Sequence, residues 1–252
     1  MHNKSVALVT GANQGIGLQI AKELAAHGFT VLVGSRSFEK GETAARSIGP
    51  DAIPLQLDVT DQASITAAAE RIRNELGRLD ILINNAAISN TGKTSAMSVQ
   101  EYAALTRASI VSLEEVRTIF ATNVFGVLAV YQAMLPLLRE SPAARIINVS
   151  SGVGSLAMNA NPASPYHASF GPGYSASKTA LNAMTLAMTV ELESTGIKVN
   201  AVSPGFIRTN LNNNEGTGTV EEGAREVMRL VRLGTDGPTG TFTRWENETI
   251  PW

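Results

Sequence analysis

The sequence predicts a single α/β domain, built on a doubly wound parallel sheet of about seven strands with helices on both faces. Short apolar runs alternate with longer segments of helical period, which is the pattern of consecutive strand–helix–strand units. A glycine-rich stretch joins the first apolar run to the first helical segment. No linker rich in Pro, Ser or Gly and no internal repeat divides the chain, so one domain is expected over residues 1–252.

The apolar runs predict strands at Val6–Val9, Thr30–Val33, Ile53–Leu57, Leu79–Ile83, Arg145–Val149 and Lys198–Val202, with a weaker seventh near Gly240–Thr243. Helices are expected between them, near residues 16–27, 61–76, 114–139, 175–194 and 220–233. In the first helix Ile16, Ile20 and Leu24 repeat at four-residue spacing, and Gly28 is expected to end it. Asp61 is expected to cap the second helix.

Composition excludes several classes of function. The chain has no cysteine, so it has no disulfide, thiolate metal site or cysteine nucleophile. Its formal net charge of −2 gives no reason to expect nucleic acid or an anionic membrane as a partner. We find neither a signal-peptide core nor an apolar segment approaching the ~20 residues of a membrane span, and we expect a cytoplasmic protein. No cluster of His, Asp and Glu has metal-ligand spacing, so no metal is expected.

The glycine-rich stretch Thr10–Gly17 lies where the first strand turns into the first helix. Gly11, Gly15 and Gly17 permit the backbone angles of such a turn and a close approach of the main chain to a pyrophosphate. The helix N-terminus adds free N–H groups and a positive dipole end. The motif therefore indicates nucleotide binding, and a glycine-rich turn without a ligand is the alternative.

The end of the second strand indicates which nucleotide is bound. An NAD ribose is usually held by an acidic side chain about 20 residues past the glycines, but here Ser35 occupies that place and Arg36 follows it. A guanidinium suits a 2′-phosphate through its charge and paired donors, so the sequence favours NADP(H). A solvated arginine at a strand end is the alternative. Asp58, at the end of the third strand, is either an acceptor for the adenine amino group or a plain strand-end carboxylate.

Tyr174 and Lys178 open the late helix four residues apart, so they project from one helix face. A free phenol has a pKa of about 10, too high for ready proton exchange at neutral pH. An ammonium ~5 Å away favours the phenolate by roughly 3 kcal/mol at an effective dielectric constant of ~20, which is about two pKa units. The pair therefore suggests an acid–base tyrosine, although such a pair taken alone is usually incidental.

Further motifs lie at the carboxyl ends of the predicted strands, where open α/β sheets bind ligands. Asn84-Asn85-Ala86 ends the fourth strand, Ser151 follows the fifth, and Pro204–Thr209 follows the sixth. Asn123 lies inside the long apolar helix. A bound dinucleotide and a mobile proton together suggest hydride chemistry on a carbonyl or an alcohol.

On these residues the chain resembles the short-chain dehydrogenase/reductase family over essentially its whole length, which implies a Rossmann-type fold. The resemblance implies that Tyr174 is the general acid in reduction and the base in oxidation, and that Ser151 holds the substrate oxygen beside it. Lys178 is expected to bind the nicotinamide ribose and to lower the tyrosine pKa. Asn123 is expected to position a water that links Lys178 to solvent.

The resemblance also implies a cofactor groove. Its expected residues are Gly11, Asn13, Gln14, Gly15, Ile16, Gly17, Ser35, Arg36, Asp58, Val59, Asn85, Ala86, Lys178, Pro204, Gly205, Ile207 and Thr209. Within the family, the glycine motif and the closing Asp236–Gly240 stretch look most like the NADPH-dependent carbonyl-reductase branch.

Departures from the family pattern concern the substrate side. Ala87 stands where glycine is more usual. The intervals before the asparagine and before the tyrosine are longer than typical, which predicts insertions near residues 90–112 and 156–173. The second insertion is shorter than the one that covers an oligomer face in carbonyl reductases, so formation of a homo-oligomer stays open. The polar stretch near residues 208–221 is expected to be a mobile substrate lid, with an ordinary polar loop as the alternative.

Apolar residues near the expected lid and second insertion are candidates to line a substrate pocket: Met158, Tyr166, Phe170, Phe206 and Leu211. The sequence thus predicts an NADPH-dependent oxidoreductase that reversibly reduces a small or medium ketone or aldehyde. Two alternatives remain: an epimerase or dehydratase that retains its cofactor, and a non-catalytic NADP(H)-binding sensor. A sensor would need neither the tyrosine nor the serine.

Overall fold

The computed structural model describes residues 4–92, 94 and 97–252. In this part of the chain one sheet runs in the order β3-β2-β1-β4-β5-β6-β7-β8. The strands are β1 (Val6–Val9), β2 (Thr30–Ser35), β3 (Ala52–Gln56), β4 (Ile81–Asn84), β5 (Arg145–Val149), β6 (Lys198–Val202), β7 (Phe242–Arg244) and β8 (Glu248–Thr249). Strands β1 to β7 pair in parallel, and β8 is antiparallel to β7. The predicted α/β fold is confirmed, with eight strands in place of about seven.

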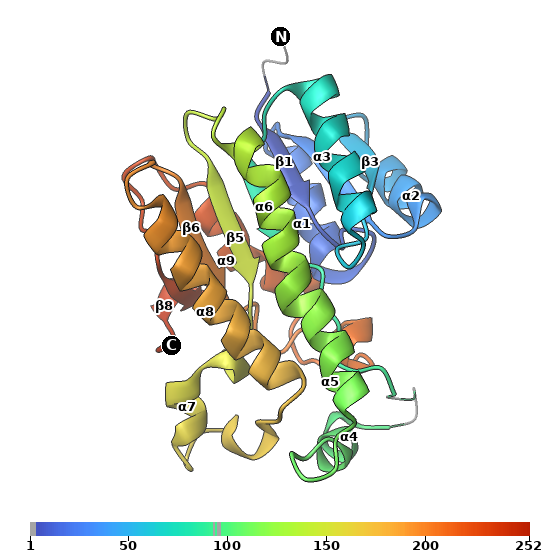
Figure 1. Cartoon of the computed structure of the whole chain (residues 1–252), viewed down its shortest axis with the longest axis vertical. Coiled ribbons are helices and arrows are strands. Elements are labelled where there is room, and N and C mark those ends of the chain that lie inside the picture. The colour runs from blue at the N-terminus through green and yellow to red at the C-terminus, as the bar shows by residue number, and fades with distance from the viewer. Residues whose placement is uncertain (1–3, 93, 95–96) are drawn as a thin grey trace.

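Helices cover both faces of the sheet (Figure 1). On the front face of that view lie α3 (Gln62–Leu76), α6 (Gly126–Leu138) and α8 (Tyr174–Leu192), and on the other α1 (Gly15–Ala26), α2 (Phe38–Ile48) and α9 (Val220–Val231). Because alternate residues of a strand point to opposite faces, Leu8 and Leu82 pack under the first set and Val9 and Ile83 under the second.

Strand β1 lies between β2 and β4, so the chain changes its direction of travel across the sheet after β3. Ligands of open α/β sheets bind at such a switch point, beyond the carboxyl ends of the strands. Figure 1 places two short helices, α4 (Val99–Leu105) and α7 (Leu156–Ala160), at the end of the molecule to which the β5 arrow points.

Local signals located the helix ends well. Asp61 caps α3 as expected, since its Oδ1 accepts a hydrogen bond from the backbone N–H of Ala63 at 3.0 Å. Gly28, which follows α1, has a φ of +85° and donates to the carbonyl of Ala25. Only glycine adopts that conformation at little cost, so the helix ends there.

Helix α2 was not predicted, and the reason is its composition. Its buried positions are Gly41, Ala44 and Ala45, which give no strong apolar repeat. A Cβ at Gly41 would stand 3.1 Å from the Cβ of Ser35, a tight contact that glycine avoids. The small residues therefore let α2 pack directly on β2.

The short elements α4, α7 and β8 were also not predicted. Helix α4 falls within the expected insertion at residues 90–112 and α7 within that at 156–173. Residues 93, 95 and 96 of the first insertion, and residues 1–3 of the expected domain, lie outside the described residues. Strand β8 has two residues, too few for a periodic signal.

The predicted helix near 114–139 is one continuous helical run, Leu113–Leu138, formed by α5 (Leu113–Phe120), a π-helical segment (Ala121–Phe125) and α6. Within the described residues this run alone is long and apolar enough to cross a membrane by length and composition, which corrects the expectation that no segment comes near this length. Half of its most apolar window is buried inside the domain, as in the core helix of a globular protein.

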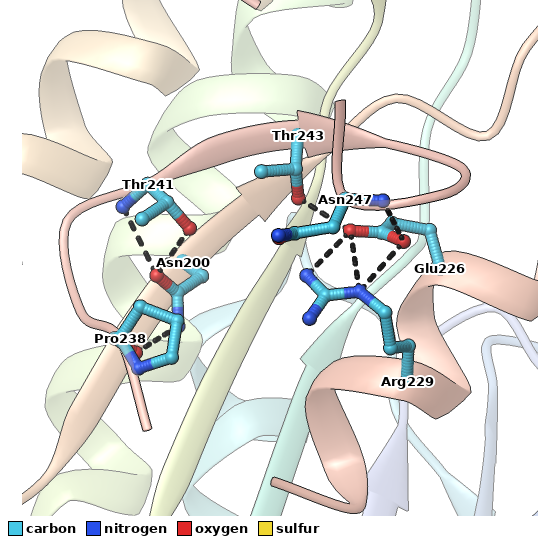
Figure 2. A network of polar contacts seen from close by, with 7 residues as sticks. All are labelled: Asn200, Glu226, Arg229, Pro238, Thr241, Thr243 and Asn247. Atoms are coloured by element: carbon cyan, nitrogen blue, oxygen red, sulfur yellow. Dashed lines mark hydrogen bonds and ion pairs between the residues drawn. The ribbon is translucent and has the colours of Figure 1, made fainter. Parts of the chain in front are cut away.

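A buried polar network anchors the last strands to α9 and β6 (Figure 2). The Glu226 carboxylate on α9 accepts from the Thr243 hydroxyl at 2.6 Å and pairs with Arg229 at 2.7 Å. The Asn200 side chain on β6 accepts from Thr241 and donates to the carbonyl of Pro238. These contacts hold β7 and the segment before it at the β8 edge of the sheet.

Candidate functional site

The glycine-rich turn is packed against the end of β4. The Asn85 side chain donates to the carbonyls of Thr10 and Gly11, at 2.9 and 3.2 Å. The Thr10 hydroxyl accepts from the backbone N–H groups of Asn85 and Ala86, both at 3.0 Å. Asn85 and Ala86, expected in the cofactor groove, therefore hold the turn in shape.

The three glycines of the motif are required for two different reasons, backbone conformation and close packing. Gly11 and Gly15 have positive φ angles, +64° and +57°, which favour glycine. A Cβ on Gly17 would overlap the Asn85 amide and stand 2.6 Å from the carbonyl oxygen of Gly11. The turn thus depends on the glycines for its path and for its packing.

The N-terminus of α1 fits a pyrophosphate. No side chain caps it within the described structure: the N-cap residue is Gln14, which makes no capping hydrogen bond. The N–H groups of the first helical turn have no partner inside their own helix, and with the helix dipole they form an anion site. Asn13 and Ile16 flank this turn, partly buried, and Ile16 also borders the cavity described below.

Ser35 and Arg36, the two residues expected near the cofactor ribose, have different environments at the end of β2. Ser35 is buried beneath α2, 2% exposed, so its side chain faces the protein interior. Arg36 is exposed, and α2 begins two residues later behind the Ser37 cap. Arg36 is therefore the residue of the two that can reach a phosphate in solvent.

Asp58 and Val59 follow β3 at the same end of the sheet. The Oδ1 atom of Asp58 accepts from the backbone N–H and the hydroxyl of Thr60, at 2.9 and 2.7 Å. Val59 is buried against Gly126, where a Cβ would stand 2.7 Å from the Val59 carbonyl oxygen. Asp58 thus supports its own turn, which leaves both earlier interpretations of this carboxylate open.

Tyr174, Ser151 and Lys178 come together as predicted. The Ser151 side chain hydrogen-bonds the Tyr174 hydroxyl. The Lys178 ammonium lies 5.6 Å from the centroid of the tyrosine ring and donates to the carbonyl of Val149 at 2.8 Å. Gly154 packs on Lys178, since a Cβ there would stand 2.8 Å from the lysine backbone. The end of β5 therefore fixes both the serine and the lysine.

The electrostatics of the pair differ from the expectation. Burial raises the pKa of Tyr174 to about 12, against a smaller lowering by the Ser151 hydrogen bond. Although the tyrosine keeps some surface open to the cavity, protein atoms surround it. Burial also lowers the pKa of Lys178 to about 7. A permanent ammonium would lower the tyrosine pKa, but the low-dielectric surroundings disfavour both charged forms.

Asn123 is fully buried in the π-helical segment. Its side chain accepts from the backbone N–H of Ile88 at 2.9 Å and donates to the Ile88 carbonyl and to the Ser177 hydroxyl, at 2.8 and 3.0 Å. Ser177 in turn donates to the carbonyl of Tyr174. Asn123 therefore ties the loop after β4 to the first turn of α8, and π-helical bulges of this kind are frequent at functional sites.

A cavity of about 230 Å³ adjoins the glycine-rich turn through Ile16 and is also lined by Tyr174 and Ser151. The loop after β6 forms one wall through Pro204, Gly205, Ile207 and Thr209. Thr209 also faces the turn, since a Cβ on Gly15 would stand 3.5 Å from its methyl group. One continuous site thus joins the glycine-rich turn, the loop after β6 and Tyr174.

The expected pocket residues are partly confirmed. Phe206 and Leu211 line the cavity, whereas Met158, Tyr166 and Phe170 do not. Met158 packs on the C-terminal cluster around Phe242, and Tyr166 lies against Gly152. In their place the cavity is lined by Tyr102 and Ala103 of α4, by Thr106 just after it, and by Glu115 and Ile119 of α5. Sequence reasoning missed these because the tertiary packing of α4 and α5, and no local motif, brings them to the site.

The segment expected as a lid is joined by hydrogen bonds to the loop before α4. Asn213 donates to the carbonyls of Thr94 and Met97, at 2.7 and 3.0 Å, and the Glu215 carboxylate accepts from the backbone N–H of Val99. The carbonyl of Leu211 accepts from the Ser89 hydroxyl at 2.7 Å. This segment is therefore placed over the cavity by specific contacts.

Comparison with known proteins agrees with this geometry. A family model described as short chain dehydrogenase matches residues 5–219. The short-chain dehydrogenase anuI of Penicillium roqueforti is 38% identical over 241 residues, covering 92% of this chain and 90% of its own. Salutaridine reductase of Papaver somniferum is 31% identical over 290 residues, covering 94% and 93%.

Solved structures give the same result. The structure of salutaridine reductase matches with a TM-score of 0.80 at 28% identity, over 96% of this chain and 100% of that one. A 3-ketoacyl-(acyl-carrier-protein) reductase from Brucella melitensis complexed with NADH matches with a TM-score of 0.78 at 26% identity, over 95% of both chains. The chain therefore belongs to the short-chain dehydrogenase/reductase family, whose members are oxidoreductases that bind nicotinamide cofactors.

Proposed function

We propose that the protein is an NADPH-dependent carbonyl reductase that converts a ketone or aldehyde to the alcohol, and reversibly the alcohol to the carbonyl. The observation that carries the proposal is the hydrogen-bonded pair of Tyr174 and Ser151, which lines the same cavity as the loop after β6 and the first turn of α1. The reductases among its relatives support this reaction class.

The cofactor would be held by residues from four strand ends. The α1 N-terminus with Gly11, Asn13, Gln14, Gly15, Ile16 and Gly17 would take the pyrophosphate, Arg36 the 2′-phosphate, Asp58 and Val59 the adenine side, and Pro204, Gly205, Ile207 and Thr209 the nicotinamide side. When bound, NADPH supplies the hydride. The exposed guanidinium of Arg36 favours a phosphate over a hydroxyl, which supports NADPH over NADH.

Tyr174 would supply the proton. With a pKa of about 12 its phenol is protonated at neutral pH, so it can donate to the oxygen of the carbonyl as that oxygen gains negative charge. Ser151 would hold the same oxygen by a second hydrogen bond. The phenolate left on Tyr174 lies beside Lys178, whose ammonium would stabilise it and favour its reprotonation.

A turnover assay tests the proposal. The purified protein is mixed with NADPH, and separately with NADH, against a panel of ketones, aldehydes and quinones, and the near-ultraviolet absorbance of the reduced cofactor is followed. We expect a fall in absorbance that needs the carbonyl compound and is faster with NADPH. Tight NADPH binding with no turnover across the panel would contradict the proposal. The cytoplasmic location and any homo-oligomer stay predictions of the sequence.

A further inference from the structure

Tyr166, which was expected in the substrate pocket, packs instead against the turn that follows Ser151. This turn is a short 3₁₀ segment, Gly152–Gly154. A Cβ on Gly152 would stand 3.0–3.1 Å from Cε2, Cζ and the hydroxyl oxygen of Tyr166, a tight contact that glycine avoids. The outer end of the Tyr166 ring therefore lies directly on the backbone beside Ser151.

The hydroxyl group of Tyr166 is bonded to the β7–β8 hairpin. The Arg244 guanidinium at the end of β7 hydrogen-bonds this hydroxyl. The Nε atom of Arg244 also donates to the Glu248 carboxylate on β8, at 2.7 Å. A guanidinium has five donors in a fixed planar arrangement, so one arginine can bind the carboxylate and the phenol together. The Tyr166 ring is thus held between the hairpin and the turn.

Contacts from the core of the domain fix the rest of the turn. The backbone N–H of Gly152 donates to the hydroxyl of Ser203, just after β6, at 2.9 Å. A Cβ on Gly154 would stand 2.8 Å from the backbone of Lys178 on α8. Ser203 and Lys178 belong to the sheet and its helices, whereas Tyr166 belongs to the second insertion. The insertion therefore supplies one of the surfaces that define the path of the turn.

The path of this turn matters because Ser151 immediately precedes it. The Ser151 side chain hydrogen-bonds the Tyr174 hydroxyl and lines the cavity. A hydrogen bond is lost when its two atoms move apart by less than an ångström, and a displacement of about 1 Å in a reacting group can cost about 10²-fold in rate. Tyr166 itself does not line the cavity. Any effect of Tyr166 on the reaction must therefore pass through the turn.

We propose that Tyr166 is a positioning residue for carbonyl reduction. Its ring, bonded to Arg244, packs on Gly152 and keeps the Ser151 hydroxyl at the Tyr174 hydroxyl, where both can bind the substrate oxygen. The assignment rests on the proposed reductase activity. It gives the second insertion a part in ordering the active site.

Steady-state kinetics of Tyr166→Ala and Tyr166→Phe test the proposal with NADPH and the best ketone. We expect kcat to fall by roughly 10- to 100-fold in Tyr166→Ala, which removes the ring from Gly152. Tyr166→Phe keeps the ring and loses only the bond to Arg244, so its kcat should fall by about two- to tenfold. NADPH affinity should stay within about twofold in both variants, because neither changes the glycine-rich turn. An unchanged kcat in Tyr166→Ala would overturn the proposal.

Tyr131→Phe is the matched control for Tyr166→Phe. It removes a tyrosine hydroxyl that donates to Glu191 at 2.8 Å, between α6 and α8, and Tyr131 does not line the cavity. We expect it to leave kcat unchanged. Arg244→Met removes the bond to Tyr166 from the other side and should match Tyr166→Phe. Equal losses of kcat in Tyr131→Phe and Tyr166→Phe would show a general effect of destabilisation and contradict the proposal.

A double-mutant cycle with Ser151→Ala separates positioning from a structural role. Ser151→Ala alone should lower kcat by about 10²- to 10³-fold, as for loss of a donor to the developing oxyanion. Once the serine hydroxyl is absent, Tyr166→Ala should change kcat by only about twofold or less. If the two losses multiply instead, Tyr166 does not act through Ser151 and the proposal fails.

Crystal structures separate this inference from the proposed reaction. The distance between the Ser151 and Tyr174 hydroxyl oxygens is compared in the native protein, Tyr166→Ala and Tyr131→Phe. We expect it to exceed about 3.5 Å in Tyr166→Ala alone. This displacement, without turnover of any carbonyl compound by the native protein, would refute the reductase proposal and retain the positioning of Ser151 by Tyr166. Turnover by the native protein, with neither distance nor kcat changed in Tyr166→Ala, would refute the positioning role and retain the reductase.

Discussion

Lys178 and Tyr174 show how burial competes with charge pairing at a single site. The lysine is 2% exposed and its pKa falls to about 7, while the pKa of the tyrosine rises to about 12. A spacing of four residues predicts that the two side chains meet, but their surroundings decide which charge each carries. The tyrosine therefore keeps its proton at neutral pH, whereas the lysine gains or loses its proton near neutral pH.

This lysine gives a prediction about stability and pH. Between the folded pKa of about 7 and the unfolded value of 10.5, the unfolded chain binds more protons than the folded one. The free energy of unfolding should therefore rise with pH across this window, by up to about 1.4 kcal/mol per pH unit. Urea unfolding of the protein without cofactor at pH 7, 8 and 9 measures the slope.

Lys178→Met should flatten this rise, because methionine does not titrate. At still higher pH the sign reverses. Tyr174, with its pKa raised above 10.0, keeps its proton when folded and loses it when unfolded, so stability falls as pH rises through that range. A slope that is the same in the native protein and in Lys178→Met would show that the lysine is not the titrating group.

Arg36 carries the prediction for the cofactor. It is exposed at the end of β2, whereas Ser35 is buried and cannot contribute. Arg36→Ala should raise KM for NADPH by roughly 10- to 100-fold, as for loss of a charged hydrogen-bond partner, and change KM for NADH by about twofold or less. Arg46→Ala, which removes an exposed arginine at the far end of α2, is the control. Equal effects of Arg36→Ala on both cofactors would contradict the assignment.

Among the elements, β1, the glycine-rich turn and α1 form a strand–turn–helix unit whose turn is packed closely against Asn85. Gly17→Ala should disrupt it, because the new methyl group would overlap the Asn85 amide and press on the Gly11 carbonyl. We expect a loss of about 1–3 kcal/mol in unfolding free energy and a loss of NADPH affinity. Gly92→Ala, where nothing lies within 4 Å, should change neither. Normal NADPH affinity in Gly17→Ala would show that the turn does not hold the cofactor.

Some elements could be predicted from the sequence and others could not, for physical reasons. The caps at Asp61 and Gly28 are signals within a few residues, and each was found. Helix α2 buries glycine and alanine opposite charged residues, so its buried face carries none of the large apolar side chains by which the other helices were recognised. The segment expected to be mobile gained its contacts from distant residues, such as Ser89 with Leu211.

At the scale of the whole molecule, Glu226 links the sheet edge to the helical layer (Figure 2). Its carboxylate is 1% exposed and bonds Thr243 on β7 as well as Arg229 on its own helix. Glu226→Ala should lower the unfolding free energy by about 3 kcal/mol, because it leaves the arginine charge partly buried without its partner.

Thermal unfolding measures the effect, and about 3 kcal/mol corresponds to a shift of several degrees in Tm for a domain of this size. Glu221→Ala, at an exposed position on the same helix, is the control. Loss of less than about 1 kcal/mol in Glu226→Ala would show that hydrophobic packing alone holds β7 and β8 in place.

The residues of the candidate site also differ in whether the sequence could predict them. Gly11, Tyr174 and Ser151 could be found in the sequence because strand ends and helix spacing place them. Tyr102 on α4 and Glu115 on α5 could not, because no local pattern places these helices at the cavity. The glycine-rich turn and Tyr174 can therefore be found from local motifs, whereas the cavity wall depends on contacts between distant parts of the chain, such as that of Val99 with Glu215.

Tyr174→Phe tests directly whether Tyr174 supplies the proton. The rate at which this variant consumes NADPH with the best ketone is measured beside its affinity for NADPH. The variant lacks only the hydroxyl that bonds Ser151. We predict that turnover falls by about 10²-fold or more, as for loss of a general acid, while NADPH affinity stays within about twofold. Turnover close to that of the native protein, with the cofactor still bound, would contradict the proposal that Tyr174 supplies the proton.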